Sequence, residues 1–254
     1  MVRDEEMLRP GERIDDLQCG GYRLIQRRDA FCFGTDSVLL ADFCRPRPGT
    51  RAVDLGCGSG AIMTLMAAHE PLLRVDGVEI QPEIADMARR GIRLNGLEER
   101  LNVWEMDVRE AAAKLGYGAY SLAVCNPPYS RQGAAIESEG KLKRVARHEG
   151  ALNPEEWALA AARLLKNGGR FAVIYPAPRA YEMMRAMERA NLAPKRICTV
   201  HGVAGRPPKF VLMDAVKGGG SQLDWLEPLV LRDVDGNYSA QWRRIYRMGE
   251  GSET

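Results

Sequence analysis

The stretch that most constrains the fold is residues 51–68. Residues 51–55 predict a buried strand, the turn Gly56-Cys57-Gly58-Ser59-Gly60 follows it, and residues 61–68 predict a helix. Glycines allow the backbone of such a turn to approach a ligand closely and to adopt positive φ. Predicted strands and helices continue to alternate up to Ile174, as in a parallel sheet covered by helices on both faces. We therefore expect an α/β fold with a doubly wound, mostly parallel sheet.

Acidic residues lie at or near the ends of three successive predicted strands. Asp54 lies in the first strand, Glu79 lies near the end of the second (residues 75–80), and Asp107 ends the third (residues 101–107). Three carboxylates make a poor lining for phosphate groups. The glycine turn also lacks the G-x-G-x-x-G spacing of a dinucleotide site and the lysine of a P-loop. The acids suit a ligand with hydroxyl groups, an amine and a positive centre.

The fourth predicted strand, residues 120–125, leads directly into Asn126-Pro127-Pro128-Tyr129. The two prolines lack backbone N–H groups, so neither a sheet ladder nor a helix can continue through them. What remains is a stiff extended turn beyond the carboxyl end of a strand, where open α/β sheets bind their ligands. By itself the turn could merely end a strand, with Tyr129 as half-buried packing. Its position behind a glycine turn and strand-end acids favours a functional site.

Two segments beside these motifs have open interpretations. Residues 33–37 form a loop before an apolar helix at 38–43, and capping of that helix by Thr35 or Asp36 would account for them. Residues 130–152 are rich in basic side chains and lack an aliphatic stripe. Loops of this length in compact domains are usually either functional or disordered. A solvated charged loop and a contact surface for RNA are both consistent with its composition.

The rest of the chain completes the prediction of the fold. We expect a hairpin in residues 12–28, helices in 83–95, 154–165, 180–190 and 240–248, and strands in 170–175, 196–200, 209–216 and 229–231. A turn rich in Gly and Pro joins the predicted strands 196–200 and 209–216 into a hairpin that provides an antiparallel edge to the sheet. We divide the chain into an N-terminal hairpin extension (1–30), a main domain (31–217) and a C-terminal strand and helix extension (218–254).

Composition sets the broad class of the protein. The 254 residues are 45% hydrophobic and 28% charged, which is typical of a soluble globular protein. Apolar runs are shorter than the roughly 18 residues that span a bilayer, and the N-terminus does not resemble a secretory signal. We therefore expect a cytoplasmic protein that does not enter the membrane. The six cysteines and three histidines are scattered without ligand spacing, so we expect no metal.

The motifs together resemble a known family. D-L-G-C-G-S-G from Asp54, the acids Glu79 and Asp107, and N-P-P-Y from Asn126 resemble the class I S-adenosylmethionine-dependent methyltransferases that modify planar amino groups. The resemblance covers about residues 30–217, and the two motifs at this spacing are specific. It implies a Rossmann-like sheet of seven strands whose glycine loop holds S-adenosyl-L-methionine.

The resemblance also implies roles for individual residues. Glu79 would hold the ribose hydroxyls, and Asp107 with Val108 would hold the adenine. Asp54 and the loop glycines would lie at the methionine end. The segment from Phe33 would close over the methionine moiety. The cofactor-binding residues implied in this way are Phe33, Gly34, Thr35, Asp36, Asp54, Gly56, Cys57, Gly58, Gly60, Glu79, Ile80, Asp107, Val108 and Asn126.

The catalytic residues implied by the resemblance are Asn126, Pro127, Pro128 and Tyr129. An aromatic amine is a poor nucleophile because its lone pair is delocalised into the ring. If the side-chain oxygen of Asn126 and the carbonyl of Pro127 accept its two N–H bonds, the nitrogen can pyramidalise and attack a sulfonium methyl held in line. Tyr129 would stack on a base that has been flipped out of its own stack. This chemistry requires neither a metal nor a covalent intermediate.

The pattern over the whole chain narrows the target. The N-terminal hairpin, the segment F-G-T-D-S-V-L-L-A and the tail at 235–239 resemble the bacterial tRNA methyltransferases that modify N6 of the adenine beside the anticodon of valine tRNA. The partner would then be tRNA, with contacts from Arg131, Lys141, Lys143, Arg144 and Arg147, and further contacts from Arg243, Arg244 and Arg247 if the substrate is large.

Other functions remain open at this stage. N-P-P-Y also occurs in enzymes that methylate guanine N2 of ribosomal RNA or a glutamine of release factors, although the latter carry an extra helical N-terminal domain for which we expect no room here. From a different class, a cofactor-binding module without turnover or an NAD oxidoreductase could use the same sheet. Binding of nicotinamide cofactor without S-adenosylmethionine would favour the oxidoreductase. The oligomeric state is not indicated by any feature of the sequence.

Overall fold

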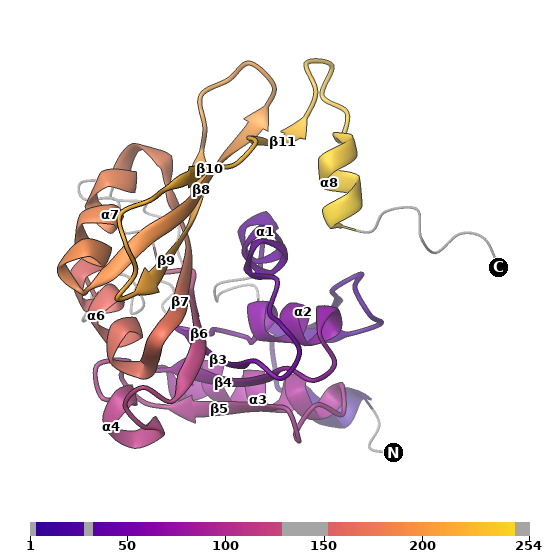
Figure 1. The fold of residues 1–254 in the computed structure, drawn as a ribbon. Helices are drawn as coiled ribbons and strands as arrows, with labels where there is room; N and C mark the ends of the chain where they lie inside the picture. The colour runs from indigo at the N-terminus through magenta and orange to yellow at the C-terminus, as the bar shows by residue number, and fades with distance from the viewer. Residues whose placement is uncertain (1–3, 28–32, 129–151, 247–254) are drawn as a thin grey trace, which may run out of the picture.

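The computed structural model describes residues 4–27, 33–128 and 152–246, and a nine-stranded sheet forms its centre (Figure 1). The strands lie in the order β10-β8-β9-β7-β6-β3-β4-β5, and β11 also pairs with β8. Their bounds are β3 Arg51–Leu55, β4 Arg74–Glu79, β5 Leu101–Glu105, β6 Tyr120–Cys125, β7 Leu165–Pro176, β8 Leu192–Val203, β9 Phe210–Lys217, β10 Asp224–Trp225 and β11 Leu229–Arg232.

The parallel part of the sheet is arranged around β3. This strand pairs in parallel with β4 on one side and β6 on the other, and β5 and β7 continue the parallel pairing outward. The carboxyl ends of these five strands therefore lie at one edge, and the chain order reverses between β3 and β6. Such a switch point is where open α/β sheets bind their ligands. The predicted doubly wound, mostly parallel sheet is confirmed.

The C-terminal part of the sheet is antiparallel, as expected, but its arrangement is more specific than the sequence indicated. β9 pairs in antiparallel fashion with both β7 and β8, so it lies between them rather than at the edge. The hairpin of β8 and β9 returns the chain into the position next to β7. The short strands β10 and β11 then pair in parallel with the outer strand β8. These two short strands enlarge a seven-stranded sheet to nine strands.

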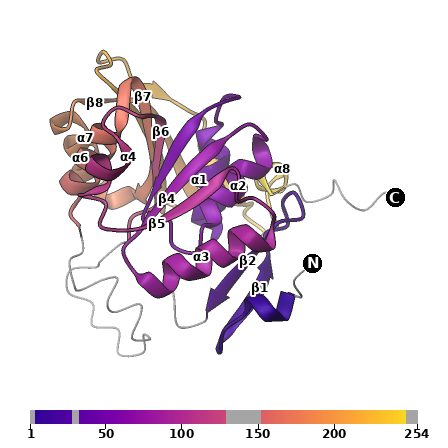
Figure 2. The same cartoon turned by 90° about the horizontal axis from the view of Figure 1, so that it is seen from below.

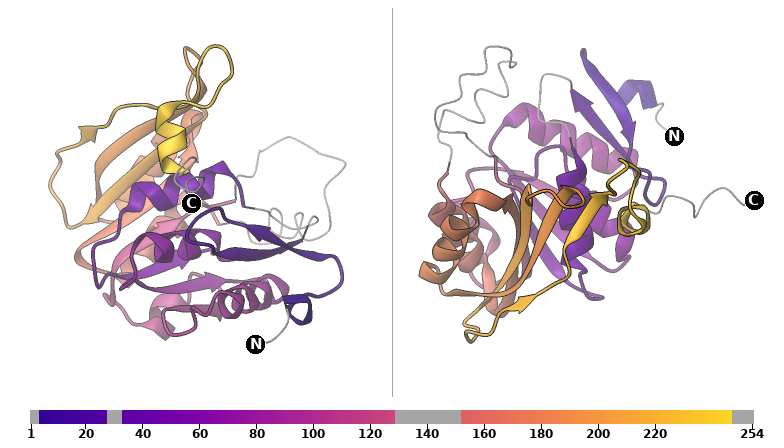
Figure 3. Two further views of the ribbon diagram at one scale, coloured as in Figure 1. Left: turned by 90° about the vertical axis from the view of Figure 1, so that its right-hand side faces the viewer. Right: turned by 90° about the horizontal axis from the view of Figure 1, so that it is seen from above.

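Helices cover both faces of the sheet, and Figure 3 shows α6 and α7 on one side of the strands and α1 with α8 on the other. Neighbouring strand residues alternate between the two cores: Leu122 and Val124 pack with α1, α2, α3 and α8, whereas Ala123 and Cys125 pack with α4, α6 and α7. The helices are α1 Thr35–Cys44, α2 Ala61–His69, α3 Pro82–Leu94, α4 Ala111–Leu115, α6 Pro154–Leu164, α7 Ala180–Arg189 and α8 Ala240–Ile245, with the short 3-10 helices η1 Asp4–Met7 and η2 Ala177–Arg179.

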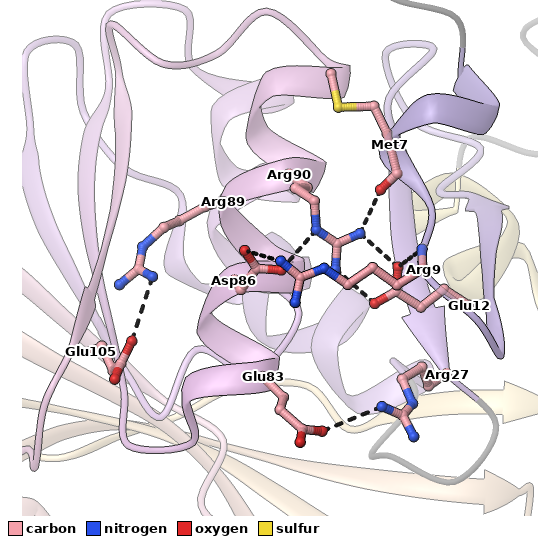
Figure 4. Close-up of polar contacts among 9 residues, drawn as sticks. All are labelled: Met7, Arg9, Glu12, Arg27, Glu83, Asp86, Arg89, Arg90 and Glu105. Carbon is pink, nitrogen blue, oxygen red and sulfur yellow. Dashed lines mark hydrogen bonds and ion pairs between the residues drawn. The ribbon is translucent and has the colours of Figure 1, made fainter.

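The predicted N-terminal hairpin consists of β1 (Glu12–Asp16) and β2 (Arg23–Arg27), which pair in antiparallel fashion. It packs against α3, as Figure 2 shows from below. A buried ion pair joins the hairpin to α3 (Figure 4): Arg90 of α3 lies 2.6 Å from a carboxylate oxygen of Glu12, and it also lies 2.8 Å from one of the partly exposed Asp86 on the same helix. The hairpin is therefore fixed to the helix that follows β4.

Helix α1 begins earlier than predicted, and the proposed cap is wrong. Gly34 is the N-cap, and within the described chain no side chain caps this end of the helix. Thr35 and Asp36 already belong to the first helical turn, where a side chain cannot act as the N-cap. The helix packs against α2 and β7, so it lies beside the centre of the sheet.

Three further observations concern the described ranges. Within them, no helix is long and apolar enough to cross a membrane. No three histidine, cysteine or acidic side chains in the same ranges gather as a metal site would require. The five cysteines in these ranges are free thiols, and four of them are buried.

Candidate functional site

The polar residues singled out from the sequence meet at the carboxyl edge of the parallel strands. Leu55, the last residue of β3, is in register with Val78 of β4 and with Cys125 of β6. The glycine loop, residues 56–60, therefore emerges between the residues that follow β4 and those that follow β6. This register brings the loop close to both Glu79 and Asn126.

The backbone of the glycine loop requires glycine at several positions. Gly56, Gly58 and Gly60 have φ of 71°, 55° and 84°, in the region that side chains disfavour. A Cβ on Gly56 would also lie 3.1 Å from Cη2 of Trp157, a buried residue of α6. The loop is fixed to the next strand because the N–H groups of Gly56 and Cys57 both donate to the carbonyl of Val78. The glycine loop thus forms a cradle, residues 56–60, that packs closely against the sheet and α6.

The carboxylate of Glu79 is part of the same cradle. It accepts hydrogen bonds from the backbone N–H of Gly58 over 3.1 Å and of Gln81 over 2.9 Å. The side chain is buried, and burial raises the pKa of Glu79 although these hydrogen bonds oppose the rise. The next residue, Ile80, is 60% exposed, which is unusual for an isoleucine at the end of a buried strand. The two carboxylate oxygens of Glu79 and the exposed apolar side chain of Ile80 therefore belong to adjacent residues at this edge of the sheet.

Asp54 is an unusual group in this site. It is completely buried, and among the described residues neither of its carboxylate oxygens has a donor in good hydrogen-bond geometry, although the backbone N–H of Met63 is close enough to lower its pKa. Burial raises the pKa of Asp54 to about 7, and the negative charge of Glu79 adds to the rise. Buried acceptors are nearly always satisfied, so a donor or a positive charge on a bound molecule would suit this carboxylate.

Asp107 lies two residues beyond the end of β5, at the outer side of the site. Its carboxylate accepts from Nε of Arg109 over 3.0 Å. Hydrogen bonding by the Arg109 side chain holds the pKa of Asp107 below its usual range. The N–H of Arg109 also donates to it over 2.8 Å. Val108 is buried against α4 and α6. Asp107 is therefore ionised and already oriented.

Asn126 follows β6 directly and is partly buried. Its Nδ2 donates to Oδ2 of Asp36 over 2.9 Å, which joins the N-P-P-Y motif to the segment of residues 33–37. Pro127 is buried, whereas Pro128 is partly exposed, so the turn is anchored at its first proline. The structure brings Asn126, Glu79, the glycine loop and residues 33–37 together, while Asp107 lies one strand further out. The remaining predicted site residues, Tyr129, Arg131, Lys141, Lys143, Arg144 and Arg147, lie outside the described residues.

Comparison with known proteins identifies the family of this site. The family model for the methyltransferase small domain matches residues 31–194, which is more than half of the chain. The chain belongs to the methyltransferase small domain family. This assigns it to the S-adenosylmethionine-dependent methyltransferases, as the motifs predicted. The match includes the glycine loop, both acids and the N-P-P-Y motif.

Individual relatives of this methyltransferase agree with the family match. A protein of Yersinia pestis (strain Pestoides F) named tRNA1(Val) (adenine(37)-N6)-methyltransferase is 28% identical over 235 residues, covering 90% of this chain and 93% of that one. A protein of the same name from Yersinia pseudotuberculosis (strain YPIII) is equally similar over 91% of its length.

Solved structures of low identity share the fold. The crystal structure of a predicted O-methyltransferase from Agrobacterium tumefaciens has a TM-score of 0.69 at 22% identity and covers 84% of this chain and 96% of that one. The geranyl diphosphate C-methyltransferase of Streptomyces coelicolor, solved with S-adenosyl-L-homocysteine, has a TM-score of 0.52 at 18% identity and covers 71% and 77%.

The structure also shows residues of this methyltransferase site that sequence patterns did not single out. Trp157 packs beneath Gly56 from an alanine-rich helix, where it looked like ordinary core. Gly77 lies in the middle of β4, and a Cβ there would lie 2.8 Å from Sγ of Cys57, so the glycine makes room for the loop. A glycine inside an apolar strand is a signal of close approach, and it could have been used.

Proposed function

We propose that this methyltransferase transfers a methyl group to N6 of an adenine in tRNA, at the adenine beside the anticodon of valine tRNA. The observation that carries the proposal is the position of Asn126, which lies at the same sheet edge as the glycine loop and Glu79. The relatives named as tRNA1(Val) (adenine(37)-N6)-methyltransferases support the choice of substrate, because their similarity extends over 90% of this chain.

The residues fit the proposed cofactor, S-adenosyl-L-methionine, which supplies a methyl group on a sulfonium. Glu79 offers carboxylate oxygens to the ribose hydroxyls, and the exposed side chain of Ile80 offers an apolar surface to the adenine. Asp54 has two buried acceptors that lack well-placed donors among the described residues, which suits the amine and positive charge of the methionine end. Asp107 and Val108 complete the adenine side, and the backbone of residues 33–36 closes over the methionine moiety.

The protein would activate the amine by accepting its hydrogen bonds. Oδ1 of Asn126 and the carbonyl oxygen of Pro127 each accept one N–H of the target, so the lone pair of the nitrogen is turned away from the aromatic ring. As the new N–C bond forms, the C–S bond breaks, and the nitrogen afterwards gives up one proton to solvent. Tyr129, outside the described residues, is proposed to stack on the flipped base.

We further propose that the main domain, residues 31–217, works in the cytoplasm on an RNA held by basic side chains of its loop. These are Arg131, Lys141, Lys143, Arg144 and Arg147, with Arg243 and Arg244 of α8, both exposed, as further contacts. If replacement of the loop residues by alanine left tRNA affinity and its dependence on salt unaltered, this surface would be wrong.

The proposed function is tested by nucleoside mass spectrometry of tRNA from cells that lack the gene. We expect N6-methyladenosine to disappear from valine tRNA, to return with the unaltered gene, and to stay absent with Asn126→Ala. Unchanged N6-methyladenosine would refute the proposal. Loss of N2-methylguanosine from ribosomal RNA, or of methylated glutamine from a release factor, would assign the same amine chemistry to another substrate.

A further inference from the structure

The carboxylate of Asp36 contacts the side chain on which the proposed chemistry depends. Nδ2 of Asn126 donates to Oδ2 of Asp36 over 2.9 Å, although 90 residues separate the two in sequence. Asp36 belongs to the first turn of α1, and Asn126 follows β6. Because the nitrogen of the Asn126 amide is turned toward Asp36, its oxygen lies on the other side of the amide group.

We propose that Asp36 is a positioning residue for methyl transfer, which holds the amide of Asn126 so that Oδ1 rather than Nδ2 faces the target amine. The inference rests on the proposed function, in which that oxygen accepts an N–H of the amine. An amide side chain can turn about its last bond at little intrinsic cost, and the turned group would present donors to the amine. An ionised carboxylate only accepts, so it selects the nitrogen of the amide and rejects the oxygen.

The surroundings of Asp36 hold its carboxylate in place for this contact. Its Oδ1 accepts from the backbone N–H of Ser37 over 3.0 Å, which leaves Oδ2 directed to Asn126. Gly34 has φ of −138° and ψ of −173°, an extended conformation that any residue adopts. A Cβ at Gly34 would nevertheless lie 3.0 Å from Oδ1 of Asp36. We conclude that Gly34 leaves room for the carboxylate and does not serve a special backbone conformation.

The same segment is tied to the cofactor cradle at its other end. Gln26 is buried. When its amide is oriented to satisfy its neighbours, the side-chain oxygen accepts from the backbone N–H of Phe33 over 2.8 Å and from Oγ of Ser59 over 3.2 Å. Ser59 belongs to the glycine loop. Residues 33–37 therefore connect the glycine loop to Asn126.

The test compares the rate of a single turnover with cofactor affinity in variants of the full chain. At saturating S-adenosylmethionine and tRNA, Asp36→Ala should lower the methyl-transfer rate about tenfold to a hundredfold, the size expected for a lost charge-assisted hydrogen bond. Cofactor Kd by calorimetry should change less than about threefold. Asp36→Asn has nearly the same shape but can also donate to the amide oxygen, so it no longer selects the nitrogen of Asn126 and should restore only part of the rate. Asp42→Ala, a carboxylate on the same helix without contact to Asn126, is the matched control.

Three results would overturn the assignment: an unchanged rate in Asp36→Ala, a loss of cofactor affinity with a normal rate at saturation, or an Asp36→Asn rate equal to that of the unaltered protein. If Asp36→Ala fails to fold, Gly34→Ala displaces the same carboxylate and should lower the same rate.

A second readout separates this inference from the proposed function. The side-chain amide resonances of Asn126, assigned by their loss in Asn126→Ala, should shift in Asp36→Ala and remain in place in Asp42→Ala. This measurement needs no substrate. If the unaltered protein methylates no tRNA, the proposed function fails, whereas an unshifted Asn126 resonance refutes the role of Asp36.

Discussion

Replacement of Asp54 by asparagine should change how the stability of the protein depends on pH. The side chain is fully buried, and its pKa is raised from 3.8 to about 7, first by burial and then by the charge of Glu79. Between about pH 4 and pH 7 the unfolded chain releases a proton that the folded protein keeps. The free energy of unfolding must therefore fall as pH rises through this window.

The size of the effect follows from the same shift. At about 1.4 kcal/mol per pH unit, the change from 3.8 to about 7 corresponds to a loss of about 4 kcal/mol at most. Asparagine has nearly the same shape and does not ionise. Urea unfolding of both proteins at several pH values should show similar stabilities near pH 4 and a variant that is more stable near pH 8. Asp235→Asn, at an exposed position, is the control and should leave the pH dependence unaltered.

Cofactor affinity should depend on pH in the opposite direction to stability, because it should rise with pH. S-adenosylmethionine is positively charged at its methionine end, so its binding favours the ionised carboxylate of Asp54. Affinity measured by calorimetry should rise up to about tenfold per pH unit below about pH 7 and then level off. Asp54→Asn should bind more weakly above pH 7 and with a smaller dependence on pH. A stability difference between the two proteins that stays constant from about pH 4 to pH 8 would falsify this account of Asp54.

Three further substitutions test other parts of the structure. Glu79→Gln should weaken S-adenosylmethionine binding roughly tenfold or more in calorimetry, because a carboxylate that accepts from the ribose is lost, and unchanged affinity would contradict this role. Gly56→Ala should lower both cofactor affinity and melting temperature, by at least about 1 kcal/mol in stability, since the new Cβ meets Trp157 at positive φ; normal values would contradict the packing. Arg90→Ala should cost about 3 kcal/mol in urea unfolding because the carboxylate of Glu12 loses its guanidinium partner and keeps, among the described residues, only the backbone N–H of Arg9 as a donor, and a loss below about 1 kcal/mol would show that the pair is solvated.

Much of the fold could be predicted from the sequence because its signals are local. An apolar strand followed by a glycine turn and a helix has few other structures, and the residue that ends each parallel strand must lie at one edge of the sheet. The positions of Glu79 and Asn126 relative to the glycine loop follow from this rule alone. The hairpin at β1 and β2 was equally local, since Gly20 and Gly21 lie between two short strands.

Other features depend on contacts that no local pattern records. The sequence of residues 210–217 is compatible with an edge strand or an interior one, so the position of β9 between β7 and β8 could not be predicted. Asp36 had an adequate local explanation as a helix cap, and only the folded chain brings it to Asn126. Trp157 looked like one of many apolar residues of a helix, because its contact with Gly56 joins residues 101 positions apart. Tertiary contacts of this kind carry the remaining information about the site.

Methylation of purified tRNA by the purified protein tests the central claim most directly. Unmodified valine tRNA would be incubated with labelled S-adenosylmethionine and digested to nucleosides for mass spectrometry. The account predicts one methyl group per tRNA, recovered as N6-methyladenosine from the position beside the anticodon, and no transfer by Asn126→Ala. Label in another nucleoside, or efficient transfer by Asn126→Ala, would contradict it.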